Sequence, residues 1–187
     1  MKYANPGHEP PPTLETDRLV VRPFTHKDAR FILTLLNDKD FIKNIQDRGV
    51  RTLDDARDYI SNGPIAGYET HGIGLCCVVE KSSQASVGMC GLLQRATLPA
   101  PDIGYAFLPE ARGKGYAYEA GKAITDYAKV ELRLKRILAV TSHSNESSKR
   151  LLTKLGFEFL HLAQFEPDSE EIPCYELKFD TKVDRFA

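Results

Sequence analysis

A short glycine- and lysine-containing run between two apolar segments is the part of this sequence best suited to chemistry. Gly113 and Gly115 flank Lys114 directly after IGYAFLPEAR (103–112), and the amphipathic segment AYEAGKAITDYAKVE (117–131) follows. Glycine permits a sharp bend and lets another group approach the backbone. The start of a helix carries unpaired N–H groups and the positive end of the helix dipole. The spacing therefore predicts an anion site, and phosphate is the usual occupant of such sites.

Two common phosphate-binding motifs do not fit this run. A P-loop requires Ser or Thr after its lysine, whereas Gly115 follows Lys114 here. The dinucleotide-binding motif G-x-G-x-x-G requires a third glycine where Tyr118 stands, and no acidic residue suited to a ribose follows in a second strand. A different phosphate-bearing ligand must therefore be considered.

A third motif fits, and it extends beyond the glycines. Residues 112–117, RGKGYA, match the R-G-x-G-x-A form of the acetyl-CoA signature of the GNAT superfamily. Three further blocks match in the same order: LETDRLVVRP (14–23), IGYAFLP (103–109) and NESSKRLLTKLGF (145–157). The sequence thus resembles a GNAT N-acetyltransferase of the RimJ/RimL-like branch, which contains the ribosomal-protein N-terminal acetyltransferases.

The resemblance implies a fold and a domain organisation. We expect an α/β (α+β) fold, a single GNAT-type acyl-CoA N-acyltransferase domain. Its mixed, mostly antiparallel central sheet would be flanked by helices, and two strands would splay apart at the CoA site. The expected limits are an N-terminal tail (1–13), the domain itself (14–180) and a C-terminal tail (181–187).

The resemblance also implies acetyl-CoA as co-substrate and a set of residues that bind it. The diphosphate would lie on the backbone amides of Arg112, Gly113, Lys114, Gly115, Tyr116 and Ala117. The pantetheine arm would pass Phe107 and Leu108, where a backbone N–H would polarise the thioester carbonyl. Asn145 would contact pantetheine in addition to capping a helix. The Lys114 side chain has a second interpretation, as a solvated surface group.

The reaction implied is direct attack of an amine on the thioester. Asp102 is the candidate base, or organiser of a water chain, with a surface carboxylate at a strand end as the alternative. Glu119 and His143 are lesser candidates. Many GNAT enzymes protonate the leaving thiolate with a tyrosine beyond the N-x-x-S helix. The segment FEFLH (157–161) lacks one, so Ser148 is the candidate for that role as well as for cofactor contact.

The acceptor is less constrained by the sequence. At pH 7 a lysine amine costs ~4–5 kcal/mol to neutralise and an N-terminal amine only ~1 kcal/mol. A protein N-terminus, a polyamine and another small amine such as an aminoglycoside stay open, and the resemblance favours the first. Candidate lining residues are Phe41, Ile45, Arg48 and Arg51, with Asp168, Glu170 and Glu171 as attractors for a cationic amine. A catalytically silent acyl-CoA-binding or regulatory module is the alternative function.

Composition limits the remaining possibilities. A chain of 187 residues with 42% hydrophobic residues is long enough for one domain with a real core. A net charge of −1 gives no general basis for binding nucleic acid or a membrane. The four cysteines have no metal-ligand spacing, so we expect no metal, and Cys76 and Cys77 should face opposite sides of one strand. With no apolar leader or spanning run, we expect a cytoplasmic monomer or homodimer.

Hydrophobic periodicity and turn residues predict the elements that position these groups. We expect the order β-α-α-β-β-β-α-β-α-β-β. Residues 38–51 should form a loop, and Gly63-Pro64 should end the second helix. Helices should start after Gly115 and after Asn145. The last two strands, 157–166 and 174–180, should enclose a loop at 167–171.

Overall fold

The computed structural model describes residues 8–164 and 170–179 as one mixed sheet between two layers of helices. The sheet has eight strands in the order β1-β2-β3-β4-β5-β6-β8-β7. Adjacent strands are antiparallel except β5 and β6, which are parallel. The strands are β1 Leu14–Glu15, β2 Leu19–Pro23, β3 Leu75–Glu80, β4 Ser86–Leu93, β5 Asp102–Phe107, β6 Arg136–Val140, β7 Glu158–Ala163 and β8 Ile172–Lys178.

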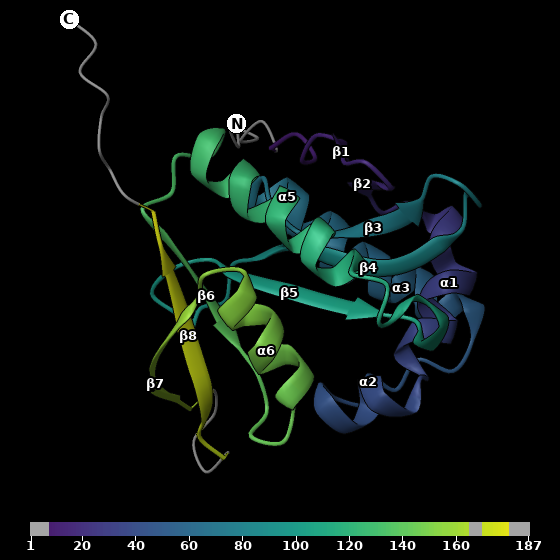
Figure 1. Ribbon diagram of the computed structural model, residues 1–187. Coiled ribbons are helices and arrows are strands. Elements are labelled where there is room, and N and C mark those ends of the chain that lie inside the picture. Colours follow the sequence, from purple (N-terminus) through teal and green to yellow (C-terminus); the bar gives the residue numbers. More distant parts are fainter. Residues whose placement is uncertain (1–7, 165–169, 180–187) are drawn as a thin grey trace, which may run out of the picture.

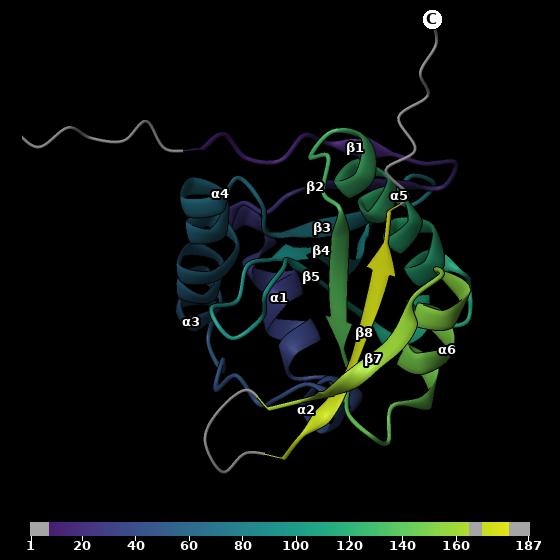
Figure 2. The same cartoon turned by 90° about the vertical axis from the view of Figure 1, so that its left-hand side faces the viewer.

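The helices divide between the two faces of this sheet. They are α1 Ala29–Leu36, α2 Lys39–Asn44, α3 Leu53–Ile60, α4 Ala66–His71, α5 Tyr116–Val130 and α6 Glu146–Lys154. Helices α5 and α6 cover one face, and α1, α3 and α4 lie on the other (Figures 1 and 2). The expected mostly antiparallel sheet flanked by helices is therefore confirmed.

Strand alternation distributes the core between these two layers. Cys76 and Val78 pack on the α5 side, while Cys77 and Val79 pack on the α1 and α3 side. All four cysteines are buried and none forms a disulfide. The small residues of α5, such as Ala120 and Ala128, are also buried, which lets this helix lie close to the strands.

Strands β5 and β6 are paired at one point only, between the start of β5 and the middle of β6. Asp102 and Leu138 are the one registered pair between them. On its other side, β6 pairs along its whole length with β8. The remainder of β5 therefore has no strand partner on the β6 side, and the expected splay is present.

Two element predictions are wrong. Residues 39–44 form helix α2, not part of a loop, and Asp38 caps it by accepting a hydrogen bond from the Phe41 N–H at 3.1 Å. The second helix does not end at Pro64. It continues through a π-helical turn, Ser61–Ile65, into α4 and ends at Gly72, which has φ +69°. The wider π turn accommodates a residue without an N–H donor.

Some predictions concern residues that the structure does not describe. The tail residues 1–7 and 181–187, and Asp168 in the loop before β8, lie outside the described ranges. The domain limits at 14 and 180 stay predictions.

Candidate active site

A cavity of about 630 Å³ opens where β5 leaves β6. Its walls come from α2, the second half of β5, the turn before α5 and the first turns of α5 and α6. Among the predicted residues, Phe107, Arg112, Gly113, Gly115, Tyr116, Ala117, Asn145 and Ser148 line it. Leu108, Lys114 and Asp102 do not. The fold thus brings most of the predicted cofactor residues to one place.

The turn before α5 presents bare backbone to this cavity. Gly113 and Gly115 have φ angles of +74° and +82°, in the left-handed region that favours glycine. No side chain caps the N-terminus of α5. Within the described chain, the backbone N–H groups of residues 113–118 make no hydrogen bond. A run of unpaired donors at the positive end of a 15-residue helix is an anion site.

Arg112 lines the cavity but its donors are occupied. Its guanidinium forms ion pairs with Asp38 and Asp40, and its Nε donates to the Phe107 carbonyl at 3.0 Å. Its backbone N–H donates to the Pro109 carbonyl at 3.2 Å. The guanidinium and the backbone N–H of Arg112 are thus paired within the protein, and its contact with the diphosphate stays a prediction. Its ion pairs hold α2 against the glycine turn.

The backbone N–H of Leu108 is paired as well. This group donates to the Val87 carbonyl at 3.0 Å, and the side chain is buried in the α1 and α3 layer. Donors alternate along an antiparallel strand, and Gly88 pairs with Phe107. The N–H of Phe107 consequently faces away from β4, toward the open side of β5. Phe107 is the better placed of the two to polarise a carbonyl.

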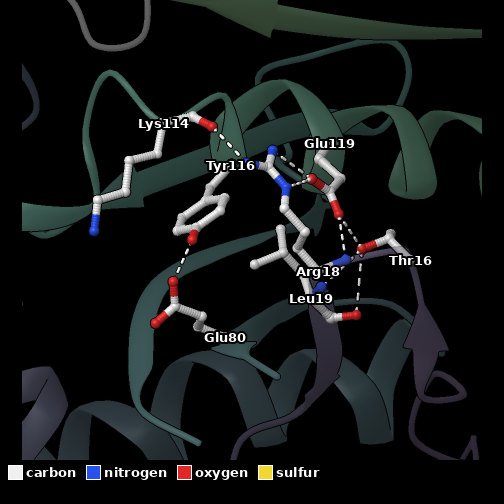
Figure 3. A network of polar contacts seen from close by, with 7 residues as sticks. All are labelled: Thr16, Arg18, Leu19, Glu80, Lys114, Tyr116 and Glu119. Atoms are coloured by element: carbon white, nitrogen blue, oxygen red, sulfur yellow. Dashed lines mark hydrogen bonds and ion pairs between the residues drawn. The ribbon is translucent and has the colours of Figure 1, made fainter. Parts of the chain in front are cut away.

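The Lys114 side chain is not part of the cavity wall, and Figure 3 shows it extending away from Arg18. Its Nζ lies 5.9 Å from the centroid of the Tyr116 ring. Lys114 therefore contributes its backbone to the turn, which matches the solvated interpretation of its side chain.

The N-terminus of helix α6 also lies at the cavity, but a side chain caps it. Asn145 caps it, because its Oδ1 accepts from the Ser148 N–H at 3.1 Å and from the Ser147 hydroxyl at 2.8 Å. The predicted cap is therefore confirmed. The buried Ser148 hydroxyl lies 2.8 Å from the Tyr105 hydroxyl.

Tyr105 is a functional candidate that sequence reasoning missed. It lines the cavity from β5, and burial raises the pKa of its phenol, so the group stays protonated as a donor. The family resemblance pointed to a tyrosine beyond α6 and not to one on β5. The signal was present in the I-G-Y block, whose alternation places Tyr105 on the α5 and α6 face together with Phe107.

Asp102 lies at the paired beginning of β5 and is fully buried, so it is not a surface carboxylate. Arg95 Nε is 3.2 Å from Asp102 Oδ1, yet neither carboxylate oxygen receives a directed hydrogen bond from a described residue. Burial raises the pKa of Asp102 to about 6, although the Arg95 charge acts to lower it. The carboxyl group therefore titrates near neutral pH, but it does not touch the cavity.

The two lesser base candidates have structural contacts. Partial burial acts to raise the pKa of Glu119, but hydrogen bonds from Thr16 and Arg18 lower it below the usual range. His143 Nε2 lies 2.7 Å from the carbonyl oxygen of Glu171. Neither residue lines the cavity.

The acceptor candidates divide similarly. Phe41 and Ile45 line the cavity from the α2 side, whereas Arg48 and Arg51 do not. The Arg51 guanidinium bonds to Asp47 and Asn37.

In the described ranges, no group of three or more His, Cys, Asp or Glu side chains could hold a metal ion, and no helix is long and apolar enough to cross a membrane.

The fold and the site together define an acetyl-CoA-dependent acyltransferase. Residues 18–158 match the family described as "Acetyltransferase (GNAT) domain", and the chain belongs to that family. Uncharacterized N-acetyltransferase YoaA of Bacillus subtilis (strain 168) is 31% identical over 149 residues, which cover 79% of this chain and 83% of YoaA.

Two solved structures share the fold at low sequence identity. RimL, a ribosomal L7/L12 alpha-N-protein acetyltransferase solved with coenzyme A, has a TM-score of 0.77 at 13% identity, covering 90% of this chain and 99% of RimL. A spermidine N-acetyltransferase from Vibrio cholerae, solved with CoA and spermine, has a TM-score of 0.71 at 16% identity, covering 87% and 96%. The family is therefore established, while the acceptor differs among its structural neighbours.

Proposed function

We propose that this chain transfers the acetyl group of acetyl-CoA to a primary amine in the cavity between α5 and α6. The observation that carries this assignment is the run of unpaired N–H groups at residues 113–118. A diphosphate on these donors would leave the thioester arm to extend along the open side of β5. The backbone donors of Gly113 to Ala117 bind the diphosphate, and the side chain of Asn145 contacts the pantetheine arm.

The chemistry is a direct displacement. The amine nitrogen attacks the thioester carbonyl carbon, a C–N bond forms, and the C–S bond breaks as the thiolate leaves. The Phe107 N–H stabilises negative charge on the carbonyl oxygen during this step. Such stabilisation is effective because the donor is already oriented by β4 pairing before the substrate arrives.

Two proton transfers complete the reaction. Ser148 gives its proton to the leaving thiolate and takes the proton of Tyr105, whose hydroxyl lies 2.8 Å from the Ser148 oxygen. Solvent returns a proton to Tyr105 as the products leave. The amine loses a proton to Asp102 through intervening water, because the carboxylate does not reach the cavity directly. The raised pKa of Asp102, about 6, suits an acceptor of this kind.

The acceptor that we propose is a protein or peptide N-terminus, in agreement with the resemblance to RimJ/RimL-like enzymes. A base acting only through water is sufficient for an amine that titrates near ~8, but hardly for a lysine-like amine near ~10.4. The α2 wall supports this choice, since the side chains of Phe41 and Ile45 offer apolar contact to the first residue of a peptide.

Free-thiol release from acetyl-CoA tests the assignment across three acceptor panels: short peptides with free N-termini, polyamines and aminoglycosides. Peptides should accelerate release most, and the same peptides with acetylated N-termini should not accelerate it. Acceleration by polyamines alone would show that the acceptor is a polyamine and not a peptide N-terminus. If no amine accelerates release while acetyl-CoA still binds, the chain is a silent acyl-CoA-binding or regulatory module.

A further inference from the structure

We propose that Arg18 is a positioning residue that orients the diphosphate-binding turn from behind. This inference rests on the proposed binding of the diphosphate by residues 113–117. Arg18 lies just before β2, about a hundred residues from the turn in sequence, and is not part of the cavity wall.

The contact between Arg18 and the turn is direct (Figure 3). One terminal nitrogen of its guanidinium donates to the Lys114 carbonyl at 2.9 Å. The other lies 3.4 Å from where a Cβ on Gly115 would stand. The guanidinium is therefore packed on the turn at the point where the chain reverses.

This hydrogen bond determines where the next donor points. In a trans peptide the C=O and the following N–H point in opposite directions. Because the Lys114 carbonyl is bonded to Arg18, the Gly115 N–H must point away from Arg18. Gly115 lines the cavity on its other side, so the bond to Arg18 aims this N–H at the proposed diphosphate.

Arg18 is itself held by Glu119 on the first turn of α5. Its Nε donates to Glu119 Oε2 at 2.7 Å, and its backbone N–H donates to Glu119 Oε1 at 2.9 Å. Thr16 donates to the same Oε1 at 2.6 Å. Three donors on one carboxylate fix the N-terminal segment, the turn and the helix relative to one another.

Tyr116 adds a second constraint on the helix start. The Arg18 Cζ lies 4.6 Å from the centroid of its ring, and its hydroxyl bonds to the carboxylate of Glu80 at the end of β3. The Glu119 charge largely offsets that of Arg18, so the forked geometry of the guanidinium matters more than its charge. Replacing Arg18 by lysine keeps the charge but loses the fork, so it should not preserve the orientation of the turn.

The test compares acetyl-CoA with acetyl-pantetheine, which carries the thioester but no diphosphate. Arg18→Met should raise KM for acetyl-CoA about tenfold, the size expected when one charge-assisted hydrogen bond is lost. The kcat at saturating acetyl-CoA and the kcat/KM for acetyl-pantetheine should be unchanged. Arg18→Lys should resemble Arg18→Met, and Glu119→Gln should shift KM in the same direction by a smaller factor.

Arg136→Met is the matched control. Arg136 forms a similar half-exposed ion pair, with Glu176 at 2.9 Å, at the start of β6. It should lower thermal stability without changing the preference for acetyl-CoA over acetyl-pantetheine.

The outcomes separate the two proposals. If the wild-type protein uses both cofactors equally well, the turn does not bind the diphosphate and the proposed site is wrong. If the wild-type protein prefers acetyl-CoA and Arg18→Met keeps the full preference, Arg18 does not position the turn. An equal loss with both cofactors also overturns the proposal, because it marks a merely structural residue. Should Arg18→Met fail to fold, an unchanged KM for acetyl-CoA in Glu119→Gln overturns it instead.

Discussion

Two helices begin at the walls of the same cavity, and they begin in opposite ways. Helix α5 starts after Gly115 with no side-chain cap, and the N–H groups of residues 113–118 have no acceptor in the described chain. Helix α6 starts at Asn145, whose side chain accepts from the Ser148 N–H. One helix end is open to a ligand, and the other is closed by its own sequence.

The difference shows how one structural element can serve two purposes. A side-chain cap contributes roughly 1 kcal/mol to stability, and α5 forgoes that contribution. Its donors are left for an anion and are oriented by contacts from behind. The cap of α6 fixes the first turn, so that the Ser148 side chain is held beside Tyr105. The open end is suited to binding, and the closed end is suited to proton transfer.

The strongest test of this division is Ser148→Ala. Loss of the proton donor should lower kcat about a hundredfold, the low end of general acid catalysis, and leave the KM for acetyl-CoA nearly unchanged. Tyr105→Phe should lower kcat by a smaller factor, because Ser148 would remain in contact with the thiolate. Steady-state kinetics with the best acceptor decide the matter. An unchanged turnover in Ser148→Ala would remove the closed end from the chemistry.

A second test concerns Asp102, on the strand that runs between the two helix ends. Its folded-state pKa of about 6 exceeds the ordinary value of 3.8, so ionisation opposes folding. The native state should lose stability as pH rises from about 4 to about 6 and level off above that. Asp102→Asn should therefore raise the free energy of unfolding at pH 7, by at most about 3 kcal/mol, and flatten its pH dependence.

Urea unfolding between pH 4 and pH 8 measures the change in stability, and steady-state kinetics over the same pH range measure the change in activity. If Asp102 accepts the proton of the amine, Asp102→Asn should also lower kcat and remove an acidic limb near pH 6. A stabilised variant with full activity would leave Asp102 as a buried structural carboxylate only.

A third test adds one methyl group to the uncapped turn before α5. Gly113 has φ +74° and no atom within 4 Å of an added Cβ, so alanine fits sterically but is strained, and it adds a methyl group to a residue that lines the cavity. Gly113→Ala should raise KM for acetyl-CoA about tenfold, with a stability cost of roughly 1 kcal/mol. Gly72→Ala, at φ +69° at the end of α4, is the control. It should show the stability cost alone; an equal rise in KM would mean that strain, not ligand contact, is responsible.

The smallest effect is expected from removing the caps themselves. Asn145→Ala and Thr52→Ala each delete a side chain that accepts from the first turn of a helix, at 3.1 Å in both cases. Each should cost about 1 kcal/mol of unfolding free energy in denaturant titrations. Only Asn145→Ala should also weaken acetyl-CoA, because α3 does not reach the cavity. Equal cofactor affinities in the two variants would limit Asn145 to capping.

Local signals predicted the glycine bend before α5 and the Asn145 cap of α6, and tertiary pairing explains what they missed. Glycines around Lys114 and the cap at Asn145 report on backbone that is determined by neighbouring residues. Tyr105 and Ser148 are 43 residues apart, and only the packing of α6 on β5 brings them together. The engagement of Arg112 by α2 likewise depends on a helix that its polar sequence did not indicate.

Strand register accounts for the choice between Phe107 and Leu108. Both residues lie in the same sequence block, 103–109, and only pairing with β4 decides which of the two N–H groups already has an acceptor. Burial of Asp102 was missed for a similar reason, since its neighbours Leu93 and Leu138 come from strands β4 and β6 on either side of it. The layers of the fold follow from periodicity, whereas the availability of individual donors does not.

The buried cysteines have a practical consequence for measuring this enzyme. Burial raises the pKa of Cys76 to about 12 and of Cys77 to about 11, and it raises those of Cys90 and Cys174 as well. Only the thiolate reacts with aromatic disulfide dyes. In native protein such a dye should thus colour with liberated coenzyme A alone, giving a turnover assay with almost no background. When the dye is added to the protein in denaturant without cofactor, it should react with four thiols for each unfolded chain and so measure the unfolded fraction.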